Sequence, residues 1–249
     1  MKKEIFLPMI MIFTVNSFGF NSQSISKIFN KPDTLHIITV NYSNSLPDSS
    51  AYINIDYPQI SGFNDDKIEK KVNELLKDEF LQSKATYEEL INDTSDYKIE
   101  GYDFAYSFDT GFELPYNSDK FLSIKLDHYE FTGGAHGNFF SIGYNIDMLN
   151  GNVLSLTDII DKESLNLLSY ECEQAILDTF QVSSLTEAGL FEDEINIASD
   201  QDFYIIPGAL VLQFDPYEIA PFSMGEINVT IPFLRIKDIL KSDLAFPTE

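Results

Sequence analysis

Closely spaced turn signals in residues 131–160 constrain the fold of this chain more than any other stretch. Gly133, Gly134 and His136 lie in a turn-rich segment between two aromatic, strand-like runs. An Asn-Gly dipeptide follows at residues 150–151, and this pair strongly favours a tight β-hairpin. Strands joined by such short turns run antiparallel, so we expect antiparallel pairing in this part of the chain.

Alternating and helical patterns extend this prediction to the rest of the chain. Alternating apolar and polar residues predict strands, and apolar residues at helical spacing predict helices. Asn64 and Thr157 are good N-cap residues for two of the helices. The predicted strands cover residues 35–42, 51–57, 97–108, 121–131, 139–147, 153–156, 203–206, 209–214 and 227–231, and further helices cover residues 165–180 and 233–240.

The order of these elements predicts an α+β fold with antiparallel or mixed sheets and helices packed on one face. Hairpin turns outnumber helical crossovers, which argues against a doubly wound parallel sheet. Strands and a helix come first, and a second set of strands and helices follows. We therefore expect two small modules, at residues 35–120 and 121–249.

The N-terminal segment, residues 1–19, has the features of a secretory signal peptide. Two lysines precede an apolar run at residues 5–15, which is too short to span a bilayer. Small residues near Gly19 suit cleavage after that position. Residues 20–34 are polar and are expected to form a flexible leader. No later apolar run reaches the length of a membrane helix, so we expect an exported, periplasmic or secreted protein without a membrane span in the mature chain.

The chain is strongly acidic, with a formal net charge of −24 from 40 acidic and 16 basic residues. Such a surface repels nucleic acid and anionic lipid, whose phosphates are bound by Lys and Arg. It would attract a cationic partner, particularly at the acidic run in residues 187–194, although charge also serves solubility alone. The single cysteine, Cys172, excludes an internal disulfide and is expected to be a buried, unreactive thiol.

Two sequence motifs add a family resemblance. Residues 129–138 read YEFTGGAHGN, and residues 208–225 read GALVLQFDPYEIAPFSMG. In this order they resemble the module of the anti-sigma factor RsiV ectodomain, which also precedes the catalytic domain of the peptidoglycan deacetylase PdaC. The resemblance covers about residues 35–240. It implies an exported α+β binding module that is not itself an enzyme and that, in RsiV, recognises lysozyme.

The resemblance therefore implies a cationic protein such as lysozyme, or peptidoglycan, as the partner, and no cofactor. We expect neither an anti-sigma nor a deacetylase role, because the sequence shows no sigma-binding segment and no deacetylase domain. The two motifs also supply the candidate binding residues. These are Gly133, Gly134, His136, Asn138, Asp215, Tyr217 and Glu218.

Three other interpretations of these residues are open. Asp127, His128 and His136 resemble a metal-ligand set, but adjacent strand residues point to opposite faces, so no metal site is expected. Asp215 or Glu218 with His136 would suit a glycan-acting enzyme if they met in one cleft. The third interpretation is a structural accessory domain without a ligand. Motifs for serine nucleophiles, zinc proteases and phosphate-binding loops are absent.

Overall fold

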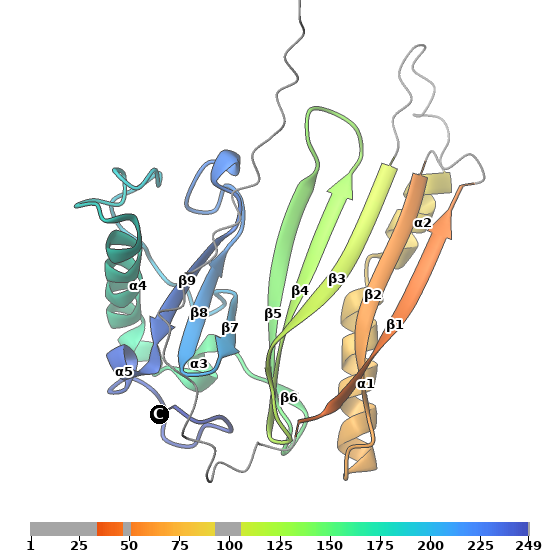
Figure 1. Cartoon of the computed structure of the whole chain (residues 1–249), viewed down its shortest axis with the longest axis horizontal. Helices are drawn as coiled ribbons and strands as arrows, with labels where there is room; N and C mark the ends of the chain where they lie inside the picture. The colour runs from red at the N-terminus through yellow and green to blue at the C-terminus, as the bar shows by residue number, and fades with distance from the viewer. Residues whose placement is uncertain (1–33, 47–50, 93–105, 249) are drawn as a thin grey trace, which may run out of the picture. The chain divides into compact units, whose positions relative to one another are not determined.

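The computed structural model describes residues 34–46, 51–92 and 106–248. The predicted signal peptide and nearly all of the predicted leader lie outside these ranges. A six-stranded sheet and a three-stranded sheet form the framework, and helices pack on one face of each (Figure 1). The predicted α+β class is confirmed. No helix within the described ranges combines the length and the apolar character needed to cross a membrane.

The six strands of the large sheet lie side by side in chain order. All neighbouring pairs are antiparallel except β2 and β3, which run parallel, so the sheet is mixed. The predicted Asn-Gly turn at residues 150–151 joins the last two strands. The strands are β1 (His36–Ser45), β2 (Ala51–Ser61), β3 (Tyr106–Asn117), β4 (Phe121–Phe131), β5 (Asn138–Asp147) and β6 (Asn152–Val153).

Two helices lie in the connection between the parallel strands β2 and β3, because no tight turn can make a parallel connection. α1 (Asp66–Leu81) and α2 (Lys84–Asn92) pack on one face of the large sheet (Figure 1). Their apolar side chains join Ile53 and Ile55 of β2 in the first hydrophobic core. Strand alternation turns Asn54 and Asp56 to the opposite, polar face, where the candidate site lies.

β3 differs from the sequence prediction. The predicted strand at residues 97–108 lies mostly outside the described residues. The stretch after it, with Gly111, Pro115 and Asn117, is predicted to be a loop, and this prediction is wrong. β3 continues to Asn117 because a register shift between Glu113 and Tyr116 accommodates Pro115. A bulge leaves one residue unpaired, which suits a proline that has no N–H to donate.

Two predicted helix caps are also wrong by one or two residues. Asp65, not Asn64, caps α1, and its Oδ1 accepts hydrogen bonds from the N–H groups of Lys67 and Ile68 at 3.0 and 3.2 Å. Ser155, not Thr157, precedes α3 (Leu156–Ile159), and its N–H donates to Asp158 Oδ2 at 2.8 Å. The charge of Asp65 interacts favourably with the dipole at the start of α1, and the Ser155–Asp158 pair forms a capping box at the start of α3.

The small sheet is antiparallel and has α4 (Leu165–Phe180) on one face (Figure 1). Its strands are β7 (Phe203–Ile206), β8 (Ala209–Phe214) and β9 (Ile227–Pro232). The predicted helix at residues 233–240 is shorter, as α5 covers only Phe233–Ile236. Two 3₁₀ turns, η1 (Lys162–Ser164) and η2 (Phe222–Met224), complete the fold.

The small sheet packs through its edge strand β7 against the polar face of the large sheet. Side chains of the large sheet satisfy the backbone of that edge, because Asn145 Nδ2 donates to Phe203 O at 2.8 Å and Ile205 N–H donates to Ser123 Oγ at 3.0 Å. Ser123 Oγ in turn donates to Asn145 Oδ1 at 2.7 Å. An edge strand that would otherwise offer free backbone groups is thereby closed.

The second hydrophobic core lies between the small sheet and α4, and it also includes Phe121 of β4. Apart from Phe121, the residues of the first core precede residue 150 in the sequence and those of the second core follow it. The predicted module boundary at residue 120 falls between β3 and β4, which are hydrogen-bonded neighbours in the large sheet. The division at that residue stays a prediction.

Candidate functional site

The two sequence motifs meet in space through aromatic rings. His136, in the loop between β4 and β5, stacks on Phe222 with ring centroids 4.0 Å apart. Phe139 and Tyr217 also contact the Phe222 ring, at 5.5 and 5.6 Å. We call these four residues the loop cluster. Two loops that are far apart in the sequence thus form one surface.

Local backbone conformation explains how the two loops hold this arrangement. Gly133 and Gly134 have φ angles of 95° and 102°, which residues with a side chain rarely adopt. Tyr217 has a φ of 72° although it is not a glycine, and its side chain is 60% exposed. His136 Nδ1 lies 2.9 Å from the carbonyl oxygen of Gly137 and can donate to it, as expected for a histidine that holds a turn.

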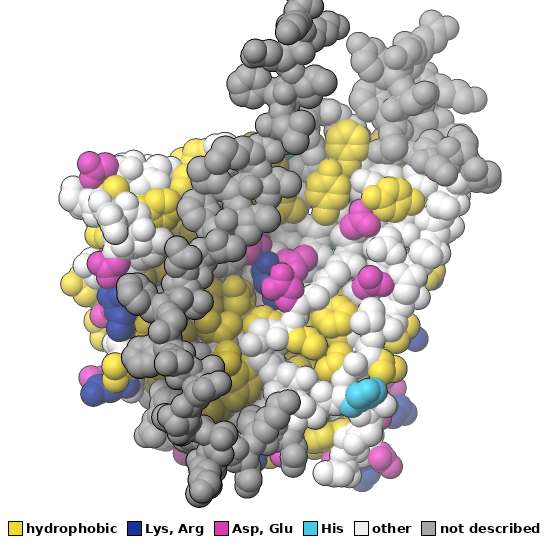
Figure 2. All heavy atoms as spheres, viewed as in Figure 1, with side chains coloured by type: hydrophobic (Ala, Val, Ile, Leu, Met, Phe, Trp, Pro, Cys, Tyr) yellow, Lys and Arg dark blue, Asp and Glu magenta, His cyan; other side chains and the backbone are white. Residues whose placement is uncertain are grey.

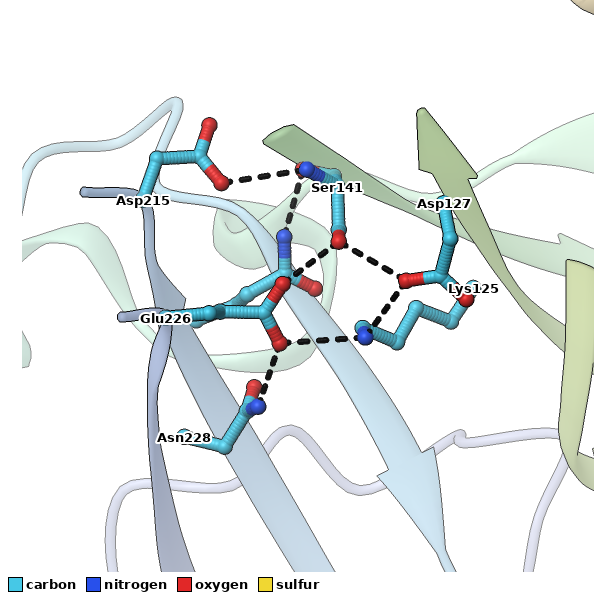
Figure 3. A network of polar contacts seen from close by, with 7 residues as sticks. Lys125, Asp127, Ser141, Asp215, Glu226 and Asn228 are labelled. Atoms are coloured by element: carbon cyan, nitrogen blue, oxygen red, sulfur yellow. Dashed lines mark hydrogen bonds and ion pairs between the residues drawn. The ribbon is translucent and has the colours of Figure 1, made fainter. Parts of the chain in front are cut away.

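A polar junction lies next to the loop cluster, where β4 and β5 face β8 and β9 (Figure 3). Lys125 Nζ forms ion pairs with Asp127 Oδ1 at 2.6 Å and with Glu226 Oε1 at 3.0 Å, and its side chain is only 11% exposed. Burial alone would lower the pKa of Lys125, but the two carboxylates outweigh it and raise the pKa above its usual value. The ammonium group therefore stays charged.

Ser141 connects this ion-pair network to the second motif. Its hydroxyl contacts both Asp127 and Glu226, and its N–H donates to Asp215 Oδ1 at 3.0 Å (Figure 3). Burial raises the pKa of Asp215 to about 6, and the nearby Glu226 contributes to the same direction. Gln213 Nε2 donates to the Ser141 carbonyl oxygen, while the buried Gln213 Oε1 has no hydrogen-bond partner within the described ranges.

A hollow of about 370 Å³ lies on the polar face of the large sheet beside this junction. Strand register puts Asn54, Asp109, Tyr129 and Phe139 in one row across β2 to β5. Figure 2 shows acidic side chains near the middle of the view, one group of them beside a basic side chain, with hydrophobic side chains above and below. The hollow is lined by Asn54, Asp56, Asp109, Thr110, Gly111, Asp127, His128, Tyr129, Phe139, Phe140, Ser141 and Glu226.

The structure brings some of the predicted site residues together. His136 and Tyr217 join the loop cluster, and Asp215 joins the polar junction through Ser141. Glu218 Oε2 accepts a hydrogen bond from the Asp215 N–H at 2.8 Å, and its Oε1 accepts one from Gln201 Nε2 at 3.0 Å. Asn138 begins β5 as an exposed residue. Their role in binding stays a prediction.

The geometry does not assemble the metal-ligand set. Asp127 and His128 point to opposite faces of β4. His128 is buried between Tyr87 Oη at 2.9 Å and Thr110 Oγ1 at 3.0 Å, and burial lowers its pKa. Within the described ranges, no group of three or more His, Cys, Asp or Glu side chains is arranged to hold a metal ion. His136 makes no hydrogen bond to Asp215 or Glu218.

Sequence reasoning missed three parts of this surface, namely Phe222, the Lys125–Glu226 pair and the hollow around Gly111. Phe222 lies in the second motif, residues 208–225, so the sequence did contain a signal for it. The Lys125–Glu226 ion pair joins β4 to the segment before β9, and no local sequence pattern predicts such a long-range contact. Asp56 alternates with apolar neighbours in a predicted strand, which does predict that it points away from the core.

Two family models match the chain in succession. Residues 47–139 match the model described as "Deacetylase PdaC". Residues 157–233 match the model described as "Protein of unknown function (DUF3298)". The order of these matches agrees with the order of the two motifs.

Two relatives from Bacillus subtilis (strain 168) are similar to this chain. The anti-sigma-V factor RsiV is 30% identical over 195 residues, which cover 76% of this chain and 65% of RsiV. The peptidoglycan-N-acetylmuramic acid deacetylase PdaC is 26% identical over 135 residues, which cover 52% of this chain and 28% of PdaC. The predicted resemblance to RsiV and PdaC is confirmed, and the chain spans only part of each relative.

Two crystal structures of DUF3298-family proteins share the fold. The protein from Bacteroides fragilis NCTC 9343 gives a TM-score of 0.71 at 19% identity, over 85% of this chain and 96% of that one. The protein from Pseudomonas aeruginosa PAO1 gives 0.66 at 21% identity, over 84% and 96%. At this level of identity the likeness concerns the fold alone.

Proposed function

Because the chain is similar in sequence to RsiV and PdaC and shares its fold with two DUF3298-family proteins, we propose that it is an exported, non-enzymatic binding module of the bacterial cell envelope. Its partner is a cationic protein that contacts the loop cluster. Lysozyme, which the RsiV resemblance implies, is the specific candidate. The observation that carries this proposal is the meeting of both motifs around Phe222.

The chemistry of the loop cluster suits protein recognition. An exposed tyrosine on a constrained backbone offers a rigid aromatic contact that loses little conformational entropy on binding. The carboxylates of Asp215 and Glu218 flank Tyr217 in the sequence and favour a positively charged partner. A net charge of −24 adds long-range attraction, which increases the association rate at low salt.

Calorimetry with hen egg-white lysozyme tests this proposal. The protein is expressed with its own N-terminal segment, and the exported form is sequenced and titrated at low and high salt. We expect Phe20 as the first residue, and binding that weakens as salt rises. Tyr217→Ala should weaken binding at least tenfold, whereas Tyr170→Ala, a matched control that is 52% exposed on α4, should not.

The alternative ligand, peptidoglycan, is tested in the same preparation. The match of residues 47–139 to the PdaC model favours a wall polymer as the second candidate. The protein could co-sediment with purified peptidoglycan and show no binding to lysozyme at either salt concentration. Peptidoglycan would then replace the cationic protein as the proposed ligand. Release of acetate or of soluble sugar fragments would instead contradict the non-enzymatic proposal.

A further inference from the structure

We propose that the hollow over Gly111 receives the guanidinium group of an arginine side chain presented by a protein partner. The hollow lies on the polar face of the large sheet, apart from the tip of the loop cluster but joined to it through Phe139, which contacts Phe222 and lines both. This inference rests on the proposed function for the class of partner and assigns a chemical group to one position on it.

The hollow exists because β3 has a glycine at its centre. A Cβ atom on Gly111 would meet no other atom within 4 Å, and its φ lies outside the positive range that only glycine tolerates. Neither crowding nor backbone conformation therefore requires a glycine here. A glycine in a strand interior also weakens the strand, and such a residue often marks a close approach by a ligand.

Carboxylates surround this floor and have unused acceptor oxygens. Asp56 Oδ1 accepts from Asn41 Nδ2 and Asp109 Oδ2 accepts from Tyr52 Oη, both at 2.7 Å, which fixes the two side chains. Their second oxygens make no hydrogen bond within the described ranges. Each carboxylate is thus oriented by a neutral donor and keeps one oxygen for a further donor.

Charge complementarity selects a cation for this position. The lining contains four carboxylates and no lysine or arginine. Lys125 does pair with Asp127 and Glu226, but this leaves Asp56 and Asp109 without a positive neighbour. A cation placed between those two would gain two charge-assisted hydrogen bonds, which are about twice as strong as neutral ones.

The aromatic lining favours arginine over lysine. Tyr129 is 40% exposed and lies beside Asp109 in the register of the sheet, and Phe139 follows it on β5. A guanidinium is planar, carries five donors and stacks on aromatic rings, whereas an ammonium is compact and strongly hydrated. A floor without a side chain, bordered by carboxylates and by two aromatic rings, matches the flat group.

Titration of acetylated, amidated tri-arginine into the full protein tests the inference, with calorimetry and the amide resonance of Gly111 as readouts. Tri-lysine is the matched peptide. Gly111→Leu fills the hollow without changing charge, and Asp56→Asn and Asp109→Asn remove the carboxylates singly. Asp238→Asn removes an exposed carboxylate outside the lining and is the control for net charge.

We expect tri-arginine to bind about five to ten times more tightly than tri-lysine and to shift the Gly111 resonance. Gly111→Leu should abolish that binding, and each asparagine variant should weaken it about tenfold, while Asp238→Asn leaves it unchanged. Equal binding of both peptides, or equal losses in Asp238→Asn, would reduce the effect to general charge attraction and overturn the inference.

The two proposals fail separately. If lysozyme does not bind but tri-arginine occupies the hollow, the proposed partner is wrong and the arginine pocket stands. If lysozyme binds with full affinity to Gly111→Leu and tri-arginine does not bind the wild type, the pocket is wrong and the proposed function stands.

Discussion

The carbonyl oxygen of Phe203 lies 1.8 Å from the position that a Cβ atom on Gly143 would occupy. Residue 143 must therefore be a glycine if β7 is to lie against β5. The same approach lets Asn145 donate to that carbonyl oxygen at 2.8 Å. One missing side chain thus permits the contact that joins the two sheets.

Gly143→Ala should lower the free energy of unfolding by about 3 kcal/mol, at the upper end for overpacking, because the clash is with backbone. Urea denaturation measures the change. Gly111→Ala is the control, since its added methyl group meets open space, and it should leave stability unchanged or slightly raised. Equal effects of the two substitutions would mean that the sheets are not held at this distance.

Lys125→Met should lower stability by about 3–5 kcal/mol, because it leaves Asp127 and Glu226 close together without their counter-charge. Lys70→Met removes an exposed charge that pairs with Glu74 at 3.7 Å, and should change stability by less than about 1 kcal/mol. Chemical denaturation at neutral pH compares the two. A small effect at Lys125 would show that water reaches the network.

Asp215→Asn should alter the pH dependence of stability. The pKa of Asp215 is raised to about 6 from 3.8, so the folded state holds this proton more tightly than the unfolded state. Stability conferred by that proton is present at about pH 4 and is lost as pH rises through 6. The variant should therefore gain on the order of 1 kcal/mol at pH 7, after allowance for partial exposure, and nothing at pH 4. Thermal unfolding across this range provides the measurement.

Tyr217→Gly should separate stability from binding. A positive φ at a residue with a side chain is strained by about 1–2 kcal/mol, and glycine relieves that strain. The variant should be as stable as the wild type or more stable, yet bind lysozyme more weakly. Chemical denaturation measures the stability of the variant, and calorimetry measures its binding to lysozyme. Loss of stability instead would show that the ring holds the loop by packing on Phe222.

The Cys172 thiol should not react with a thiol reagent in the folded protein. It is fully buried on α4, and burial raises its pKa to about 12, so almost no thiolate is present at neutral pH. Absorbance after addition of a disulfide reagent should rise only when denaturant unfolds the chain. Prompt reaction in native buffer would indicate that α4 opens readily.

Periodicity predicted much of the fold because each element buries one regular face. The apolar residues of α4, the alternation in β4 and β5 and the apolar run of β8 predicted elements close to those observed. The Asn-Gly pair at residues 150–151 also predicted its hairpin correctly. Such patterns are local, so they can be recognised in the sequence without knowing what each face contacts.

Other features depend on contacts between distant residues. Pro115 suggested a loop, but a bulge keeps it inside β3. Asp65 and Ser155 cap helices where a neighbouring residue looked equally suitable. For the candidate site, the motifs predicted His136 and Tyr217. No sequence pattern marks Lys125 and Glu226, whose pairing depends on how the two sheets pack.

The closure of β7 by side chains of β4 and β5 restricts how this protein can be recombined with its relatives. A chimaera joined near residue 150 would keep β7 but replace Ser123, Gly143 and Asn145, and the transplanted strand would have bare backbone groups against a mismatched face. A graft of the C-terminal segment must therefore carry β4 and β5 with it. The unit that can be exchanged with a related protein is therefore the whole interface around β7, and not a continuous segment of sequence.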